Sequence, residues 1–99
     1  MGRIGTVNVQ TFDHVFDALA DTPAEAANLK ARAELVSALR VRVRSWDVTQ
    51  QAAAARLGIT RPRLNDLMRG KLAKFSLDAL VNLTAAAGLA LEIRVADAA

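Results

Sequence analysis

Cysteine is absent from this 99-residue chain, which excludes disulfides and thiolate metal sites. A single histidine, His14, leaves little for a histidine-based metal or catalytic centre. The four aromatic residues are few beside the many Ala, Leu and Val residues, a balance that favours helices over a β-sandwich. No apolar run approaches the roughly 18 residues of a membrane span, and the N-terminus lacks a signal-peptide pattern. We therefore expect one cytoplasmic domain over residues 1–99, without metal, cofactor, membrane contact or enzymatic activity.

Positive charge is concentrated in the middle of the chain. The formal net charge is +3, but residues 40–74 hold nine Arg and Lys against two Asp, a local charge of +7. The segments on both sides are mildly acidic. This distribution indicates a polyanionic partner for the middle segment, with a merely solvated cationic surface as the alternative.

Hydrophobic spacing predicts a mostly helical chain. Residues 12–19 have helical periodicity, and Thr22 with Glu25 forms a capping-box pattern that begins a long helix ending near Ser45. The stripe of that helix that is expected to face the core consists of Leu29, Ala33, Val36, Leu39 and Val43.

Three further hydroxyl residues mark helix starts. Thr49, Thr60 and Ser76 are the expected N-caps, and Gly88 is the expected end of the last helix. Residues 89–95, "LALEIRV", alternate between apolar and other side chains, which predicts a terminal strand. Residues 1–11 are expected to form a flexible arm or an edge strand. The expected fold class is all-α, with about five helices and a short C-terminal β-strand.

Residues 50–70 have the spacing of two short helices joined by a tight turn. A small residue at Ala54 lets the helices cross closely, and Gly58 can adopt the positive φ of the turn. The apolar residues hold the second helix against the first, so its polar face must protrude. The expected scaffold consists of Ala53, Ala54, Leu57, Gly58, Ile59, Thr60, Leu64 and Leu67.

The segment "TQQAAAARLGITRPRLNDLMRGK" resembles the helix-turn-helix of the Xre/lambda-repressor-like DNA-binding proteins. Its opening Thr-Gln, turn glycine and closing Gly-Lys occupy the usual places. Residues 12–95 resemble a compact branch that includes many HigA-like antitoxins, encoded beside a RelE-like ribonuclease toxin. The resemblance implies a sequence-specific DNA-binding transcriptional repressor, the antitoxin of a type II toxin–antitoxin pair that autoregulates its operon. A stand-alone or phage-type regulator without a toxin, or an interaction subunit that mainly occludes a toxin, are alternatives.

The resemblance also implies which residues contact double-stranded DNA. It places residues 61–69 in the major groove, where Arg can pair with guanine, Asn with adenine and Asp with cytosine. The base-reading candidates are Arg61, Pro62, Asn65 and Asp66, although the position of Pro62 favours a role in initiating the helix over a base contact. The phosphate-binding candidates are Gln50, Arg63, Arg69, Lys71 and Lys74.

The terminal strand suggests how two copies could assemble. A lone strand has unpaired backbone groups on both edges, so pairing between two subunits would give a homodimer suited to a palindromic operator. The expected dimer strand contains Leu89, Leu91, Ile93 and Val95, with Leu91 and Ile93 buried by the pairing. Pairing with the N-terminal arm of the same chain is the alternative.

Overall fold

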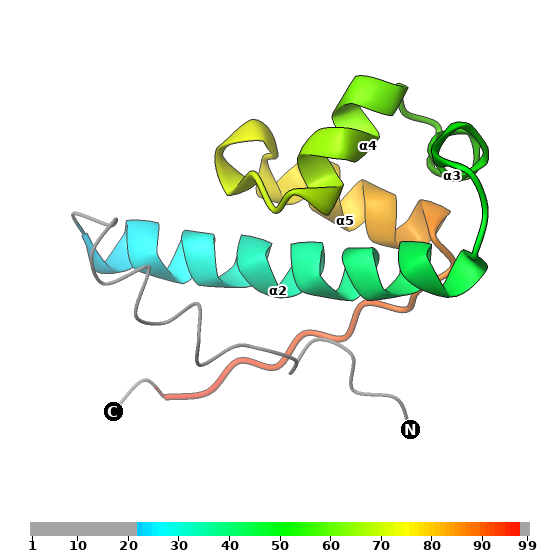
Figure 1. The fold of residues 1–99 in the computed structure, drawn as a ribbon. Helices are drawn as coiled ribbons and strands as arrows, with labels where there is room; N and C mark the ends of the chain where they lie inside the picture. The colour runs from blue at the N-terminus through cyan, green and yellow to red at the C-terminus, as the bar shows by residue number, and fades with distance from the viewer. Residues whose placement is uncertain (1–21, 98–99) are drawn as a thin grey trace.

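The computed structural model describes residues 22–97. This part of the chain contains four α-helices, α2 (Pro23–Trp46), α3 (Gln50–Leu57), α4 (Arg61–Met68) and α5 (Leu77–Ala86), and one 3-10 turn, η2 (Leu72–Lys74). The long helix α2 runs the length of the molecule, and the shorter helices gather on one side of it (Figure 1). The all-helical class is thus confirmed for residues 22–97. The helix expected over residues 12–19 and the arm expected over residues 1–11 lie outside the described residues.

Each of the four α-helices of residues 22–97 begins at the hydroxyl residue expected from the sequence. The Oγ atom accepts a hydrogen bond from the backbone N–H three residues later, at Thr22 (3.1 Å), Thr49 (3.1 Å), Thr60 (3.3 Å) and Ser76 (3.1 Å). The capping box at α2 is incomplete, because Glu25 Oε1 accepts from the Thr22 hydroxyl (3.1 Å) rather than from its backbone N–H. The caps fix where the chain turns into each helix.

The core lies between α2 and the layer formed by α3, α4 and α5. Its largest fully buried side chains are Val36, Leu39, Leu64, Leu67, Phe75 and Leu80. Ala33 and Val43 are also buried, so four of the five residues expected on the inner stripe of α2 face the core.

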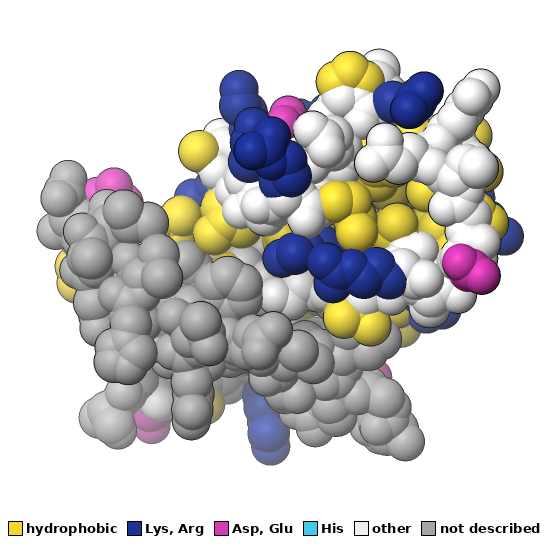
Figure 2. All heavy atoms as spheres, viewed as in Figure 1, with side chains coloured by type: hydrophobic (Ala, Val, Ile, Leu, Met, Phe, Trp, Pro, Cys, Tyr) yellow, Lys and Arg dark blue, Asp and Glu magenta, His cyan; other side chains and the backbone are white. Residues whose placement is uncertain are grey.

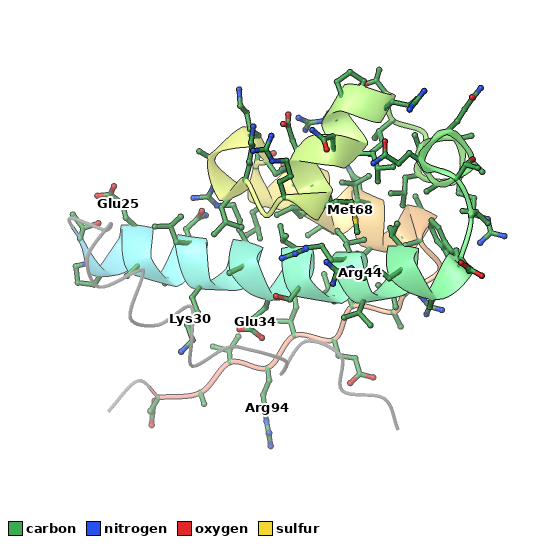
Figure 3. The ribbon with its side chains drawn as sticks, viewed as in Figure 1. Glu25, Lys30, Glu34, Arg44, Met68 and Arg94 are labelled. Carbon is green, nitrogen blue, oxygen red and sulfur yellow. The ribbon has the colours of Figure 1, made fainter. Side chains whose placement is uncertain are left out.

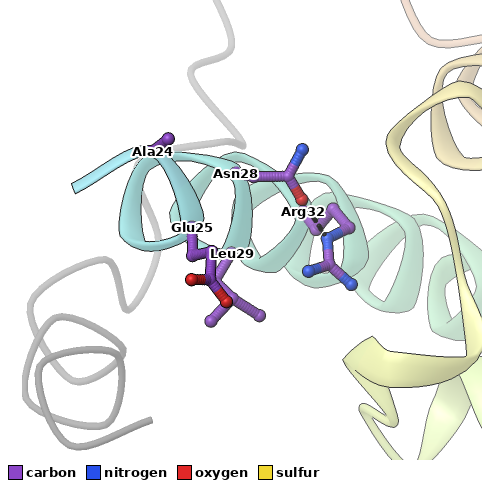
Figure 4. Close-up of a pocket in the computed structure, with 5 residues that line it drawn as sticks. All are labelled: Ala24, Glu25, Asn28, Leu29 and Arg32. Carbon is purple, nitrogen blue, oxygen red and sulfur yellow. Dashed lines mark hydrogen bonds between the residues drawn. The ribbon is translucent and has the colours of Figure 1, made fainter. Parts of the chain in front are cut away.

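Leu29 corrects that expectation. It is only half-buried and lines a shallow pocket near the start of α2, together with Ala24, Glu25, Asn28 and Arg32 (Figure 4). The core of the described residues begins one turn later, at Ala33, because the shorter helices pack against the later turns of α2. Helical spacing gives the face on which a residue lies, but not how far along the helix the neighbouring helices reach.

The terminal strand predicted over residues 89–95 is not formed in the structure of the single chain. Leu89 packs against the core and its N–H donates to Thr84 O (2.9 Å), but residues 89–97 form no strand with any described residue. Leu91, Ile93 and Val95 are 40%, 78% and 88% exposed in the single chain, and the burial of Leu91 and Ile93 between two subunits stays a prediction. Alternation gives an extended segment one apolar face. A strand also needs a hydrogen-bonded partner strand, and no segment within residues 22–97 supplies one.

Candidate nucleic-acid interface

The turn between α3 and α4 is a Schellman motif centred on Gly58. Gly58 has φ +71°, in the left-handed region, and its N–H donates to Ala55 O (3.2 Å). The N–H of Ile59 donates to Ala54 O (3.0 Å), which completes the motif. No heavy atom lies within 4 Å of the place that a Cβ on Gly58 would occupy. Glycine is therefore favoured here by the backbone conformation and not by lack of space.

Apolar residues on both helices are directed into the core. Ala53, Ala54 and Leu57 of α3 are buried, as are Leu64 and Leu67 of α4. Ile59, in the turn, is half-buried and packs against the same core. Because α4 is held by these residues, its opposite face is left at the surface.

The exposed face of α4 carries most of the base-reading candidates. Arg61, Pro62 and Asn65 are exposed, and Arg61 and Asn65 lie four residues apart, so they share one side of the helix. Asp66 is half-buried and its Oδ1 lies 3.5 Å from Lys71 Nζ. The Lys71 N–H also donates to the Asp66 carbonyl (3.0 Å). The structure thus joins one base-reading candidate to one phosphate-binding candidate.

Arg63 is turned away from the exposed face and toward the chain that follows α4. Its Nη1 donates to Lys74 O (3.0 Å), and its guanidinium carbon lies 4.4 Å from the centre of the Phe75 ring. Phe75 is buried, so this stacking holds the arginine against the core. Arg63 was expected to bind phosphate, and the structure gives it an additional role within the fold.

Arg32 is a structural residue that the sequence did not reveal. From α2, its Nη1 donates to Leu72 O (2.8 Å) and Phe75 O (3.2 Å), and its Nε donates to Asn28 Oδ1 (2.6 Å; Figure 4). Arg32 and Arg63 therefore bind the carbonyls of the η2 segment from two different helices. The spacing of Asn28 and Arg32 is visible in the sequence, but carbonyl partners 40 and 43 residues away are not.

Basic side chains surround the exposed face of α4. Figure 2 shows Lys and Arg gathered on the side of the molecule that presents α4 and the turn after it. Arg69, Lys71 and Lys74 are exposed there, and Gln50 is exposed at the first position of α3. We call Gln50, Arg61, Asn65, Arg69, Lys71 and Lys74 the α4 face.

One arginine of α2 lies beneath the end of α4. A Cβ on Gly70 would lie 3.5 Å from Arg40 Nη1, so this guanidinium reaches the turn between α4 and η2. Its Nε is buried and has no hydrogen-bond partner among the described residues. Arg40 adds positive charge directly behind the α4 face.

Comparison with protein families agrees with this geometry. A family model described as a helix-turn-helix domain matches residues 18–96. The chain belongs to this helix-turn-helix family. No curated protein matches the chain. The match supports the Xre-like assignment and indicates a DNA-binding regulator, a class that is typically not enzymatic.

Outside the α4 face, residues 22–97 of this helix-turn-helix protein show no group for a metal ion and no helix for a membrane span. This part of the chain has no group of three or more His, Asp or Glu residues placed to hold a metal ion. No helix among the described residues is both long enough and apolar enough to cross a membrane. The α4 face, with its exposed polar and basic side chains, is the candidate site for a partner.

Proposed function

We propose that this protein is a sequence-specific DNA-binding transcriptional repressor that inserts α4 into the major groove. The observation that carries the proposal is the α3–α4 unit itself. A Schellman turn at Gly58 sets the two helices, Leu64 and Leu67 hold α4 against the core, and the polar side of α4 is left exposed among basic residues. This is the arrangement by which a helix-turn-helix presents its second helix to base edges.

The residues of α4 take different roles in this proposal. Arg61 donates to guanine O6 and N7, and Asn65 pairs with adenine. The exposed ring of Pro62 can contact a thymine methyl. Asp66 accepts from a cytosine amino group only when a carboxylate oxygen turns from Lys71, so we assign it a weaker contribution to base reading.

Phosphate contacts position the protein on the duplex without reading sequence. We assign these phosphate contacts to Gln50 at the start of α3 and to Arg69, Lys71 and Lys74, which follow α4 in the chain. The free N–H groups of Arg63 can add a contact while Nη1 stays on Lys74 O. Two copies on a palindromic operator would repress transcription by covering a promoter in the cytoplasm.

Site selection from a random duplex pool tests the proposal. The wild-type protein should enrich one motif, and Arg61→Ala should weaken binding to it by about 1–3 kcal/mol and relax the preference at one base. Lys71→Ala should weaken binding to all duplexes about equally.

Arg56→Ala is the matched control, because it removes the same charge from α3. The Arg56 guanidinium stacks 4.7 Å from the centre of the Trp46 ring, and Arg56 is not among the residues assigned to bases or phosphates. This variant should keep the sequence preference of the wild type. The placement of the reading face would be wrong if Arg61→Ala selected the wild-type motif with undiminished affinity.

The antitoxin role is a narrower part of the proposal, supported by the resemblance of residues 12–95 to HigA-like proteins. It requires a neighbouring gene for a RelE-like ribonuclease whose expression stops growth. Co-expression of this chain should then restore growth, also with Arg61→Ala, if neutralisation and base reading use different surfaces. A neighbouring gene that is harmless would leave the stand-alone regulator as the function.

A further inference from the structure

Arg40 of α2 carries a positive charge that has no anionic partner within residues 22–97. No carboxylate of this part of the chain forms an ion pair with it, and no hydrogen bond engages its guanidinium. Figure 3 shows Glu34, an acidic residue of the same helix, pointing to the side of α2 away from α4. Only Nε of Arg40 is buried, so its two Nη groups are open to an acceptor. A guanidinium is always charged and donates several hydrogen bonds, so an incoming anion would satisfy groups that the described residues leave unpaired.

The Arg40 guanidinium lies beside residues that are assigned to phosphates. A Cβ on Gly70 would lie 3.5 Å from Arg40 Nη1. Gly70 stands between Arg69 and Lys71 in the chain, and both of these side chains are exposed. Figure 2 shows Lys and Arg side chains over α2 as well as over α4 on this side of the molecule. Arg40 therefore brings a charge from a different helix to the end of the α4 face.

The turn after α4 leaves the Arg40 guanidinium uncovered. Gly70 has φ +70°, and its N–H donates to Leu67 O (3.0 Å). The N–H of Lys71 donates to Asp66 O (3.0 Å), which completes a Schellman motif. The left-handed conformation favours glycine, and a glycine has no side chain to lie over Nη1. The turn that ends α4 thus also leaves open the approach to Arg40.

We propose that Arg40 binds a DNA phosphate beyond the end of α4 through its two Nη groups. This inference rests on the proposed DNA binding and adds a contact from α2 to those assigned around α4. Base edges face the first turns of a recognition helix, so a group beyond the last turn lies nearer to the backbone of the duplex. Because Nε is buried, Nη1 and Nη2 are the donors, and they match the two non-bridging oxygens of one phosphate.

Arg40 differs from Lys71 in how its charge is balanced before DNA binds. Lys71 Nζ lies 3.5 Å from Asp66 Oδ1, whereas Arg40 has no carboxylate partner within residues 22–97. Each phosphate neutralised by a free cation contributes about −0.9 to the log–log salt slope. A cation that first leaves a carboxylate contributes less. Arg40 should therefore account for more of the salt dependence of DNA binding than Lys71.

Salt titration of duplex binding by the full chain tests the Arg40 contact. Arg40→Gln keeps part of the aliphatic stem but removes the charge. It should weaken binding to every duplex by about tenfold at a salt concentration of about 0.1 M and reduce the log–log slope by about 0.9. Arg40→Lys keeps the charge and should recover most of the slope but less of the affinity, because lysine lacks the planar fork. Both variants should keep the motif that the wild type prefers, since phosphate contacts carry no sequence information.

Arg42→Gln is the matched control on the same helix. Arg42 is half-buried like Arg40, and its Nε is also buried without a hydrogen-bond partner among the described residues. It lies two residues further along, about 200° round α2, so its side chain leaves from the opposite side of the helix. Arg42→Gln removes the same charge and should reduce affinity and slope far less. Equal losses in the two variants would mean that net charge matters and not the place of Arg40, which would overturn the proposal.

Neutral phosphates locate the contact on the DNA and separate it from any effect on the fold. A methylphosphonate at one backbone position of the selected duplex removes one negative charge. At the phosphate bound by Arg40, this change should weaken binding of the wild type and have little further effect on Arg40→Gln, because both changes remove the same interaction. A variant that merely folds less well would still respond to every methylphosphonate as the wild type does. That response would show that Arg40 makes no phosphate contact.

The results for Arg40 and Arg61 distinguish this contact from the proposed sequence recognition. Unchanged affinity and slope for Arg40→Gln, together with a relaxed base preference for Arg61→Ala, would refute the Arg40 contact and keep the proposed function. A reduced slope for Arg40→Gln in a protein that selects no motif would keep the phosphate contact and refute sequence-specific binding. A wild-type chain that binds no duplex would refute both.

Discussion

The turn glycine of the helix-turn-helix allows a clean prediction, because its contribution comes from the backbone alone. Gly58→Ala puts an L-residue at φ +71°, which costs about 1–2 kcal/mol. The added Cβ meets no heavy atom within 4 Å, so there is no steric contribution. Alanine also restricts the unfolded chain, which offsets about 0.4–1 kcal/mol. The expected net loss of stability is therefore about 1 kcal/mol, or roughly 4–8 °C in Tm for a domain of this size.

Urea denaturation followed by the fluorescence of Trp46, the only tryptophan, measures this loss. Gly88→Ala is the matched control, because Gly88 has φ +75° after α5 and equally open space around it. Both variants should lose similar stability, whereas only Gly58→Ala alters the α3–α4 turn and so the binding of a selected duplex. An unchanged or raised urea midpoint for Gly58→Ala would refute the reasoning, since it would mean that the left-handed turn is dispensable.

Two further variants test the arginines that bind the η2 carbonyls. Arg63→Ala should lower the free energy of unfolding by about 1 kcal/mol, because it removes the hydrogen bond to Lys74 O and the stacking on Phe75. Arg63→Lys should recover little of this loss, because lysine lacks the planar guanidinium group. Urea denaturation of both variants measures the two losses. Arg32→Ala should lower the free energy of unfolding by about 1–3 kcal/mol in the same assay. Asn28→Ala should lower it less, because this variant leaves both carbonyl contacts of Arg32 intact. Equal losses in the two variants would contradict this role of Arg32.

Local signals in the sequence were sufficient for most of the helical framework. The hydroxyl caps at Thr49, Thr60 and Ser76 accept hydrogen bonds from backbone groups three residues away, so the local sequence is enough to predict them. The same holds for Gly58, because its left-handed turn directs hydrogen bonds to carbonyls in the last turn of the helix just before it. The burial of Leu64 and Leu67 followed from helical periodicity, which also identified the exposed side of α4.

Long-range contacts were not predictable in this way. Arg32 binds backbone carbonyls, which every residue possesses, so no residue type marks its partners. Arg63 looked like a free cation because its stacking on Phe75 depends on how the chain folds back after α4. The strand expected over residues 89–95 failed for a similar reason, since alternation is local but a ladder partner is not. Whether the residues assigned to bases and phosphates make those contacts is a prediction for the DNA-binding experiments.

Lys71 already has a counterion in the free protein, the carboxylate of Asp66 at 3.5 Å. A duplex gains affinity by releasing the cations condensed around it as the protein's charges take their place, with a log–log slope of about −0.9 per phosphate neutralised. A lysine whose charge is balanced internally displaces fewer of these cations than a free one. A salt titration of the complex should consequently count fewer phosphate contacts than the basic residues of the α4 face suggest, and Asp66→Asn should steepen the dependence. In the proposed complex, Asp66 on α4 would therefore reduce how strongly DNA binding responds to ionic strength.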